Sequence, residues 1–159
     1  MRRFAALSLI AFVMACAGTQ TPASDTAAAS GAVAAPAPAG LDLSQLAGNW
    51  NFRGMPENSD STLLTYVMTA TSTREGWSLD FTDRTEAVPL RVVEVSGDSI
   101  VTEAGPYSSA LRPNTQVTTR TVFRQQDGKL VGRTVARYSG PGVGADTVRI
   151  IRQEGTKVQ

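Results

Sequence analysis

Residues 116–138 read QVTTRTVFRQQDGKLVGRTVARY, and this stretch decides the fold. On each side of Asp127-Gly128, an apolar residue, a threonine or a small residue occupies every second position, and arginine recurs between them. A period of two over several residues is typical of a strand with one buried face. Asp-Gly between two such runs is a strong signal for a two-residue hairpin turn. We therefore expect two adjacent antiparallel strands, Gln116–Gln125 and Lys129–Tyr138.

Six more runs rich in β-branched and aromatic residues share the chain with this hairpin. They are Trp50–Arg53, Thr62–Thr71, Gly76–Phe81, Val88–Val95, Ser99–Gly105 and Thr147–Glu154. Leu41–Gly48 predicts one short helical turn, capped by Asp42 and ended by Gly48. Short connections favour antiparallel neighbours, and eight such strands can close into a barrel.

The expected fold class is thus all-β. It is a small antiparallel up-and-down β-barrel of about eight strands, preceded by one short helical turn. We expect the domain to span residues 41–154, with residues 155–159 as a tail, because one domain of this size can bury its own core.

The chain begins with a positive and then apolar segment. Arg2 and Arg3 precede Phe4–Val13, which is almost entirely apolar. This segment is shorter than the ~20 residues that span a bilayer, but it fits the apolar region of an export signal. Val13-Met14-Ala15-Cys16 then resembles the lipobox of bacterial lipoprotein precursors. The resemblance implies a signal peptide at residues 1–15 and lipidation of Cys16. The alternative is an ordinary secretory signal with an incidental cysteine.

The residues after the lipobox predict a tether and a location. Residues 16–40 consist mainly of Ala, Pro, Ser, Thr and Gly with a single charge, Asp25, so we expect a disordered linker. Ala17 is not aspartate, which resembles the pattern of Gram-negative lipoproteins sent to the outer membrane. The expected location is the cell envelope, lipid-anchored in the outer membrane and facing the periplasm or the surface.

Composition argues against several classes of function. Lys plus Arg number 15 and Asp plus Glu number 14, so no basic excess favours nucleic acid as a partner. The chain has no histidine and one cysteine, so Ser-His and Cys-His catalytic pairs and the usual zinc ligand sets are missing. We therefore expect no enzyme activity, no metal and no cofactor.

Gly48-Asn49-Trp50, after the helical turn and at the start of the first strand, resembles the Gly-x-Trp signature of lipocalins and related barrels. The resemblance implies that Trp50 packs at the closed end of a barrel, against an arginine from late in the chain. Arg149 and Arg152 are the candidates for that arginine. The chain departs from the family in having no C-terminal helix and no clear second or third motif.

The alternation also predicts which side chains line a barrel interior. Small and hydroxyl residues on the inward face of the later strands would leave room for a small molecule and a few polar contacts. Gly105–Pro113, a predicted long connection, adds an aromatic residue and an arginine near the mouth. The candidate ligand-binding residues are Trp77, Tyr107, Arg112, Thr119, Thr121, Gly132, Thr134 and Tyr138. The alternative is a barrel filled by side chains, with the small residues opposite the tryptophans.

Two functions follow from these alternatives. The first is non-catalytic binding of a small apolar or amphipathic molecule inside the barrel. An internal cavity would favour this function. The second is an envelope protein–protein interaction module with a filled barrel, which docks through an outward apolar patch. The predicted patch comprises Val93, Val95, Val122, Val131 and Val135.

Overall fold

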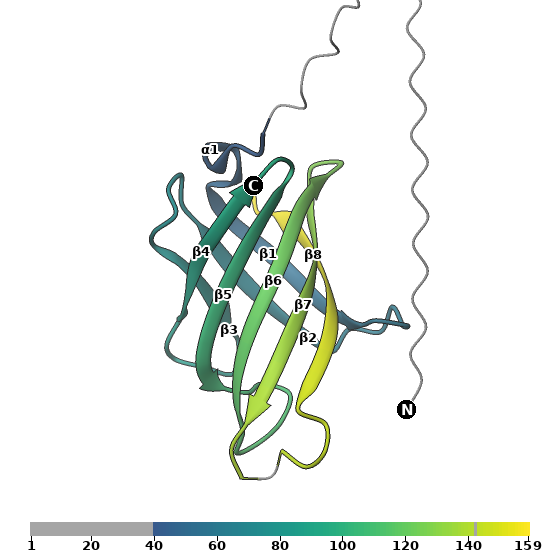
Figure 1. The fold of residues 1–159 in the computed structure, drawn as a ribbon. Helices are drawn as coiled ribbons and strands as arrows, with labels where there is room; N and C mark the ends of the chain where they lie inside the picture. The colour runs from purple at the N-terminus through teal and green to yellow at the C-terminus, as the bar shows by residue number, and fades with distance from the viewer. Residues whose placement is uncertain (1–39, 142) are drawn as a thin grey trace, which may run out of the picture. The chain divides into compact units, whose positions relative to one another are not determined.

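The computed structural model describes residues 40–141 and 143–159, and these form a closed antiparallel barrel (Figure 1). A four-residue helix, α1 (Leu43–Leu46), precedes the strands. The strands are β1 (Gly48–Pro56), β2 (Leu64–Ala70), β3 (Trp77–Phe81), β4 (Val88–Ser96), β5 (Ser99–Ser108), β6 (Gln116–Gln126), β7 (Lys129–Ser139) and β8 (Val148–Lys157). Each strand pairs with its neighbour in the chain, and β8 pairs with β1. The expected fold class is confirmed. The predictions for residues 1–39, including Cys16, fall outside the described residues.

The β6–β7 hairpin forms as its sequence predicts. Its ladder runs without a break from the pair Gln116–Ser139 to the pair Gln126–Lys129. Asp127 and Gly128 have φ of +50° and +75°, which suits the two-residue turns that match the twist of paired strands. The predicted alternation also holds, since Val117, Thr121 and Phe123 of β6 are buried while the arginines between them are exposed.

A bulge in β4 reverses one predicted orientation. The register with β5 shifts between Val92 and Glu94, so one extra residue is inserted there. Beyond the bulge Val95 pairs with the fully buried Ile100 and packs against the core. The expectation that Val95 faces outward is therefore wrong, because a one-residue insertion exchanges the two faces of a strand.

A second irregularity brings Tyr107 to the interior. The prediction placed Gly105–Pro113 in a loop, but β5 continues to Ser108. The β5–β6 register shifts between Ala104 and Tyr107, and Tyr107 then pairs with the buried Val117. Gly105 makes this possible, because its φ is +109° and a Cβ there would lie 2.6 Å from the carbonyl oxygen of Val117.

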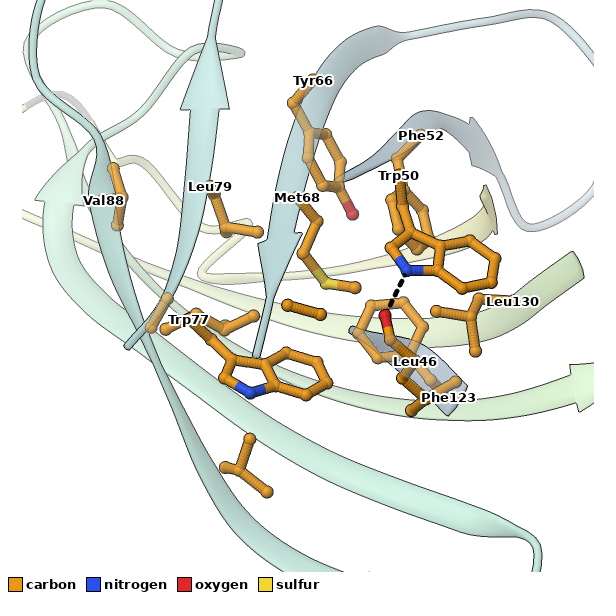
Figure 2. Packing of buried hydrophobic residues seen from close by; sticks show 14 of the residues in the cluster. Leu46, Trp50, Phe52, Tyr66, Met68, Trp77, Leu79, Val88, Phe123 and Leu130 are labelled. Atoms are coloured by element: carbon orange, nitrogen blue, oxygen red, sulfur yellow. Dashed lines mark hydrogen bonds between the residues drawn. The ribbon is translucent and has the colours of Figure 1, made fainter. Parts of the chain in front are cut away.

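Helix α1 closes one end of the barrel. Asp42 accepts a hydrogen bond from the Ser44 amide, as an N-cap does, and Gly48, with φ of +123°, follows the C-cap Ala47. Leu46 is fully buried, and its carbonyl oxygen accepts a 2.7 Å hydrogen bond from Trp50 Nε1 (Figure 2). Each such buried side chain stabilises the fold by ~1.5–3 kcal/mol relative to an exposed one.

The cation that lies over Trp50 is not one of the predicted arginines. Lys157 Nζ is 5.6 Å from the ring centroid, and Trp50 and Lys157 are opposite each other in the β1–β8 ladder. In the same ladder Arg152 is opposite Met55, near the other end of β1, and Arg149 precedes it on β8. The register therefore keeps both arginines away from Trp50. It also makes residues 155–157 part of β8, where a tail was expected.

Candidate ligand-binding site at the open end of the barrel

The two ends of the barrel are built differently. The end with α1 holds one longer connection, residues 71–76, and the two-residue turns Gly97-Asp98 and Asp127-Gly128. The opposite end carries four longer connections, which include the described residues 57–63, 82–87, 109–115, 140–141 and 143–147 (Figure 1). The side chains of Trp50, Phe52, Phe123 and Leu130 fill the closed half (Figure 2). Any internal room therefore lies toward the open end.

A small cavity lies inside the open half. Its volume is about 50 Å³, against the roughly 300–1,000 Å³ of ordinary ligand pockets. It is enough for roughly three to five water molecules. Apolar side chains make up most of its wall, with threonines and one glutamine among them. The lining residues are Leu64, Tyr66, Leu79, Phe81, Tyr107, Ser109, Ala110, Leu111, Val117, Thr119, Thr121, Thr134, Ala136, Tyr138, Ile151 and Gln153.

Four lining side chains form one buried hydrogen-bond chain. Tyr66 donates its hydroxyl proton to Gln153 Oε1 at 3.2 Å, and Gln153 Nε2 donates to Thr134 Oγ1 at 3.1 Å. Thr134 and Thr121 then share a hydrogen bond of 2.8 Å between their hydroxyls. Whichever threonine donates, the hydroxyl proton of the other has no acceptor among the described residues. The second amide hydrogen of Gln153 has no acceptor there either. This series of hydrogen bonds therefore ends in donor groups that have no acceptor.

Thr102 adds a further polar group beside this chain. It is fully buried, and its Oγ1 has no hydrogen-bond partner in the part of the protein that the structure describes. Thr102 pairs with Thr121 across the β5–β6 ladder, and Thr121 pairs with Thr134 across β6–β7. We call Tyr66, Thr102, Thr121, Thr134 and Gln153 the polar belt. Buried polar groups without partners are costly, so the belt favours an occupant that can hydrogen-bond.

Two arginines lie on aromatic rings that line the cavity. The Arg84 guanidinium carbon is 5.2 Å from the centroid of Tyr107 and 5.3 Å from that of Phe81. The Arg112 guanidinium carbon is 4.3 Å from the centroid of Tyr138. These distances are typical of cation–π contacts. The open end therefore combines an apolar interior with two guanidinium groups at its rim.

Burial raises the pKa of two phenols at this end. It raises the pKa of Tyr66 far above its usual range, and it raises the pKa of Tyr107 as well, although the charge of Arg84 acts in the opposite direction on Tyr107. Desolvation disfavours the charged phenolate, so both hydroxyls, which are neutral near pH 7 in any case, remain donors of hydrogen bonds to higher pH as well.

The β5–β6 connection covers the cavity like a lid. Ser109, Ala110 and Leu111 line the cavity, and Leu111 packs against a cluster that includes Val117 and Tyr138. Ser109 Oγ accepts hydrogen bonds from the amides of Leu111 and Arg112 at 3.1 and 3.0 Å. Arg112 Nη1 also donates to the carbonyl oxygen of Asp146 at 2.6 Å, which ties this connection to the one between β7 and β8.

The structure brings together most of the predicted ligand-binding residues, but not all of them. The cavity lining includes Tyr107, Thr119, Thr121, Thr134 and Tyr138, and Arg112 lies at the rim.

Trp77 and Gly132 lie elsewhere. Trp77 is buried in the core, and its Nε1 donates to the carbonyl oxygen of Thr73. At Gly132 a Cβ would lie 2.6 Å from the Phe123 ring. The prediction that Gly132 leaves room for a ligand is therefore wrong, because an aromatic ring already occupies that space.

Among the residues of this end that sequence reasoning missed are Tyr66, Phe81, Arg84, Leu111 and Gln153. For Gln153 a signal existed. It stands between Ile151 and Gly155 on the inward face of β8, where a polar side chain is unusual. Arg84 carried no such signal, since it belongs to a connection whose path the alternation of strands does not predict.

The outer surface offers a second, shallower feature. Three of the predicted outward valines, Val122, Val131 and Val135, border a hollow of about 570 Å³ over β6 and β7, together with Arg120, Arg124 and Arg133. We call this the outer hollow. Elsewhere on the outer surface, Glu154 lies between Arg53 at 2.6 Å and Lys129 at 2.7 Å. These two cations lower the pKa of Glu154 to about 2.

Residues 40–141 and 143–159 contain no group of three or more His, Cys, Asp or Glu side chains placed to hold a metal ion. Within the same ranges no helix is both long and apolar enough to cross a membrane. Comparisons with protein-family models, with curated proteins and with solved structures found no match to this chain.

Proposed function

We propose that this chain is a lipid-anchored protein of the cell envelope whose barrel binds one small, largely apolar molecule at its open end, without catalysis. The observation that carries the binding proposal is the polar belt, four of whose members line a largely apolar cavity and leave donors without acceptors there. Small-molecule sites are commonly built from apolar walls with a few placed polar groups. The anchor is proposed from the lipobox-like residues that end at Cys16.

The size of the cavity sets a condition on binding. A molecule of eight or more heavy atoms needs more room than about 50 Å³. Leu111 is the side chain best placed to yield, because it comes from the lid and is only half-buried. We therefore expect the ligand to displace Leu111 and to present a hydrogen-bond acceptor to Thr121 or Thr134.

The test is a fluorescence titration with the neutral apolar dye N-phenyl-1-naphthylamine. Residues 16–159 with Cys16→Ser serve as the reference protein, since they lack the lipid. Leu111→Ala should increase the affinity several-fold, because it enlarges the cavity. Leu43→Ala is the matched control, as Leu43 is also half-buried but packs at the closed end. A reference protein that gives no saturable signal, or two variants that change the affinity equally, would contradict the proposal.

A second candidate function is docking of an envelope protein on the outer hollow. The observation that favours it is the exposure of Val122, which is 39% accessible and lies among three arginines. The closed half of the barrel beneath is filled by side chains. Val122→Asp should then reduce cross-linking to that protein in intact cells while leaving dye binding unchanged. A variant that cross-links as the parent does would remove this candidate.

A further inference from the structure

Arg84 has an unusual environment for an arginine. Its side chain is 18% exposed, and its Nε is buried without a hydrogen-bond partner in the described part of the chain. The nearest carboxylate oxygen belongs to its neighbour Asp83, at 4.0 Å from Nε, which is beyond hydrogen-bond distance. The rings beneath the guanidinium, Phe81 and Tyr107, both line the cavity. An unmet cationic donor therefore lies at the edge of the proposed binding site.

The rim differs from the outer surface of the barrel in how its arginines are paired. Six arginines on the outer surface have a carboxylate oxygen within 3.7 Å: Arg53, Arg91, Arg120, Arg124, Arg133 and Arg152. Arg112, at the rim, has no such partner among the described residues, and Arg84 has only the distant Asp83. Arg149 also lacks a carboxylate partner among the described residues. It pairs with the inward-facing Ala136 in the β7–β8 ladder and precedes Ile151 of the cavity wall by two residues, so it belongs to the same rim.

These three rim arginines are half-buried, so water compensates their charges less well than at the surface. Among the residues that the structure describes, the other arginines without an ion pair are Arg74 and Arg137, and both are exposed. A half-buried guanidinium gains most from an anion, because charge-assisted hydrogen bonds are about twice as strong as neutral ones.

We propose that the molecule bound at the open end is an amphipathic acid, and that Arg84 pairs with its acidic group. This inference rests on the proposed function and specifies its ligand. The largely apolar body, which carries the hydrogen-bond acceptor for the polar belt, enters past Leu111, and the acidic group stays at the rim beside Tyr107. Simple alkyl probes therefore test the acidic group alone. Arg112 and Arg149 lie at the same end of the barrel, as do the carboxylates of Asp83 and Asp146, so the pairing is assigned to Arg84 and not to a general positive charge.

The test compares octanoate with octan-1-ol, which share an apolar body and differ in charge at neutral pH. Each competes with N-phenyl-1-naphthylamine for residues 16–159 with Cys16→Ser. We expect octanoate to bind about tenfold more tightly than octan-1-ol, the size of one charge-assisted hydrogen bond. Arg84→Gln should remove this preference and leave the affinity for octan-1-ol within twofold. Arg137→Gln, which removes the same charge from an exposed outward position, should change neither affinity.

The outcomes separate the two proposals. If octanoate and octan-1-ol bind the parent equally well, or if Arg84→Gln and Arg137→Gln have the same effect on the octanoate affinity, the proposal of an amphipathic acid is wrong. The proposed binding function is then unaffected. If neither probe nor the dye binds, the proposed function fails, and this inference fails with it. Arg84→Lys covers the case in which Arg84→Gln does not fold, because it keeps the charge without Nε and should retain only part of the preference.

Discussion

Gly132→Ala tests whether the closed half of the barrel is as tightly filled as the structure indicates. A Cβ at this position would lie 2.6 Å from Phe123 Cδ1 and 2.8 Å from the carbonyl oxygen of Val122. Ordinary carbon contacts are ~3.5–4.0 Å, so the ring and the neighbouring strand must both move by about 1 Å. No positive φ requires glycine here, so alanine is strained only by this contact.

The expected cost can be worked from two opposing effects. Overpacking of a filled core typically costs about 1–3 kcal/mol. Replacing glycine restricts the unfolded chain and returns about 0.4–1 kcal/mol. The free energy of unfolding should therefore fall by about 1–2 kcal/mol, which lowers the Tm of a domain of this size by about 3–10 °C.

Urea denaturation and thermal melting of Gly132→Ala measure this cost, and two controls locate its origin. Gly54→Ala should cost less, because the nearest atoms to its Cβ are side-chain atoms of Ile151 and Leu64 at 3.2 Å. In a Phe123→Leu background the cost of Gly132→Ala should shrink, because the two positions interact directly. A neutral Gly132→Ala, or an equal cost in both backgrounds, would refute the contact with the ring.

Three further predictions concern the ion pairs, the polar belt and the anchor. Glu154→Gln should cost roughly 0.5–1 kcal/mol at pH 7. Because the folded pKa of Glu154 is lowered to about 2, this difference from the parent should persist above the unfolded pKa and vanish in urea melts as the pH falls from 4.5 towards 2. Gln153→Leu leaves the buried Tyr66 hydroxyl without a partner and removes one of the two hydrogen bonds of Thr134. It should cost about 1–3 kcal/mol in the same assay, more than Thr121→Val, which removes only the hydrogen bond between the two threonines. Cys16→Ser should release the protein from membranes, and a variant that still pellets after salt and carbonate washes would contradict the lipid anchor.

The strands were predictable because burial on one face imposes a period of two on the sequence. The β6–β7 hairpin shows this most directly, since its alternation and its Asp127-Gly128 turn both hold in the structure. The bulges were not predictable in the same way. A single inserted residue in β4 turns Val95 inward, and the irregularity in β5 does the same for Tyr107. Strand β4 remains rich in strand-forming residues around the insertion, so its composition does not reveal the inserted residue.

The candidate site was predictable as far as it depends on strand faces. Thr121 and Thr134 meet because both face inward at the same level of the ladder. Gly132 indicated that another group lies close to the backbone there. The sequence did not predict that this group is the ring of Phe123 and not a ligand. Arg84 depends on how a connection folds onto Tyr107 from a distant strand, and no local pattern records that contact.

The most direct test of ligand binding at the open end is an NMR titration of isotope-labelled residues 16–159, carrying Cys16→Ser, with octan-1-ol. We expect saturable shifts of the amides of Leu111, Thr121 and Thr134 at the lid and the polar belt, with Leu46 at the closed end unchanged. The absence of saturable shifts, or shifts confined to Val122 and the outer hollow, would contradict a binding site inside the barrel.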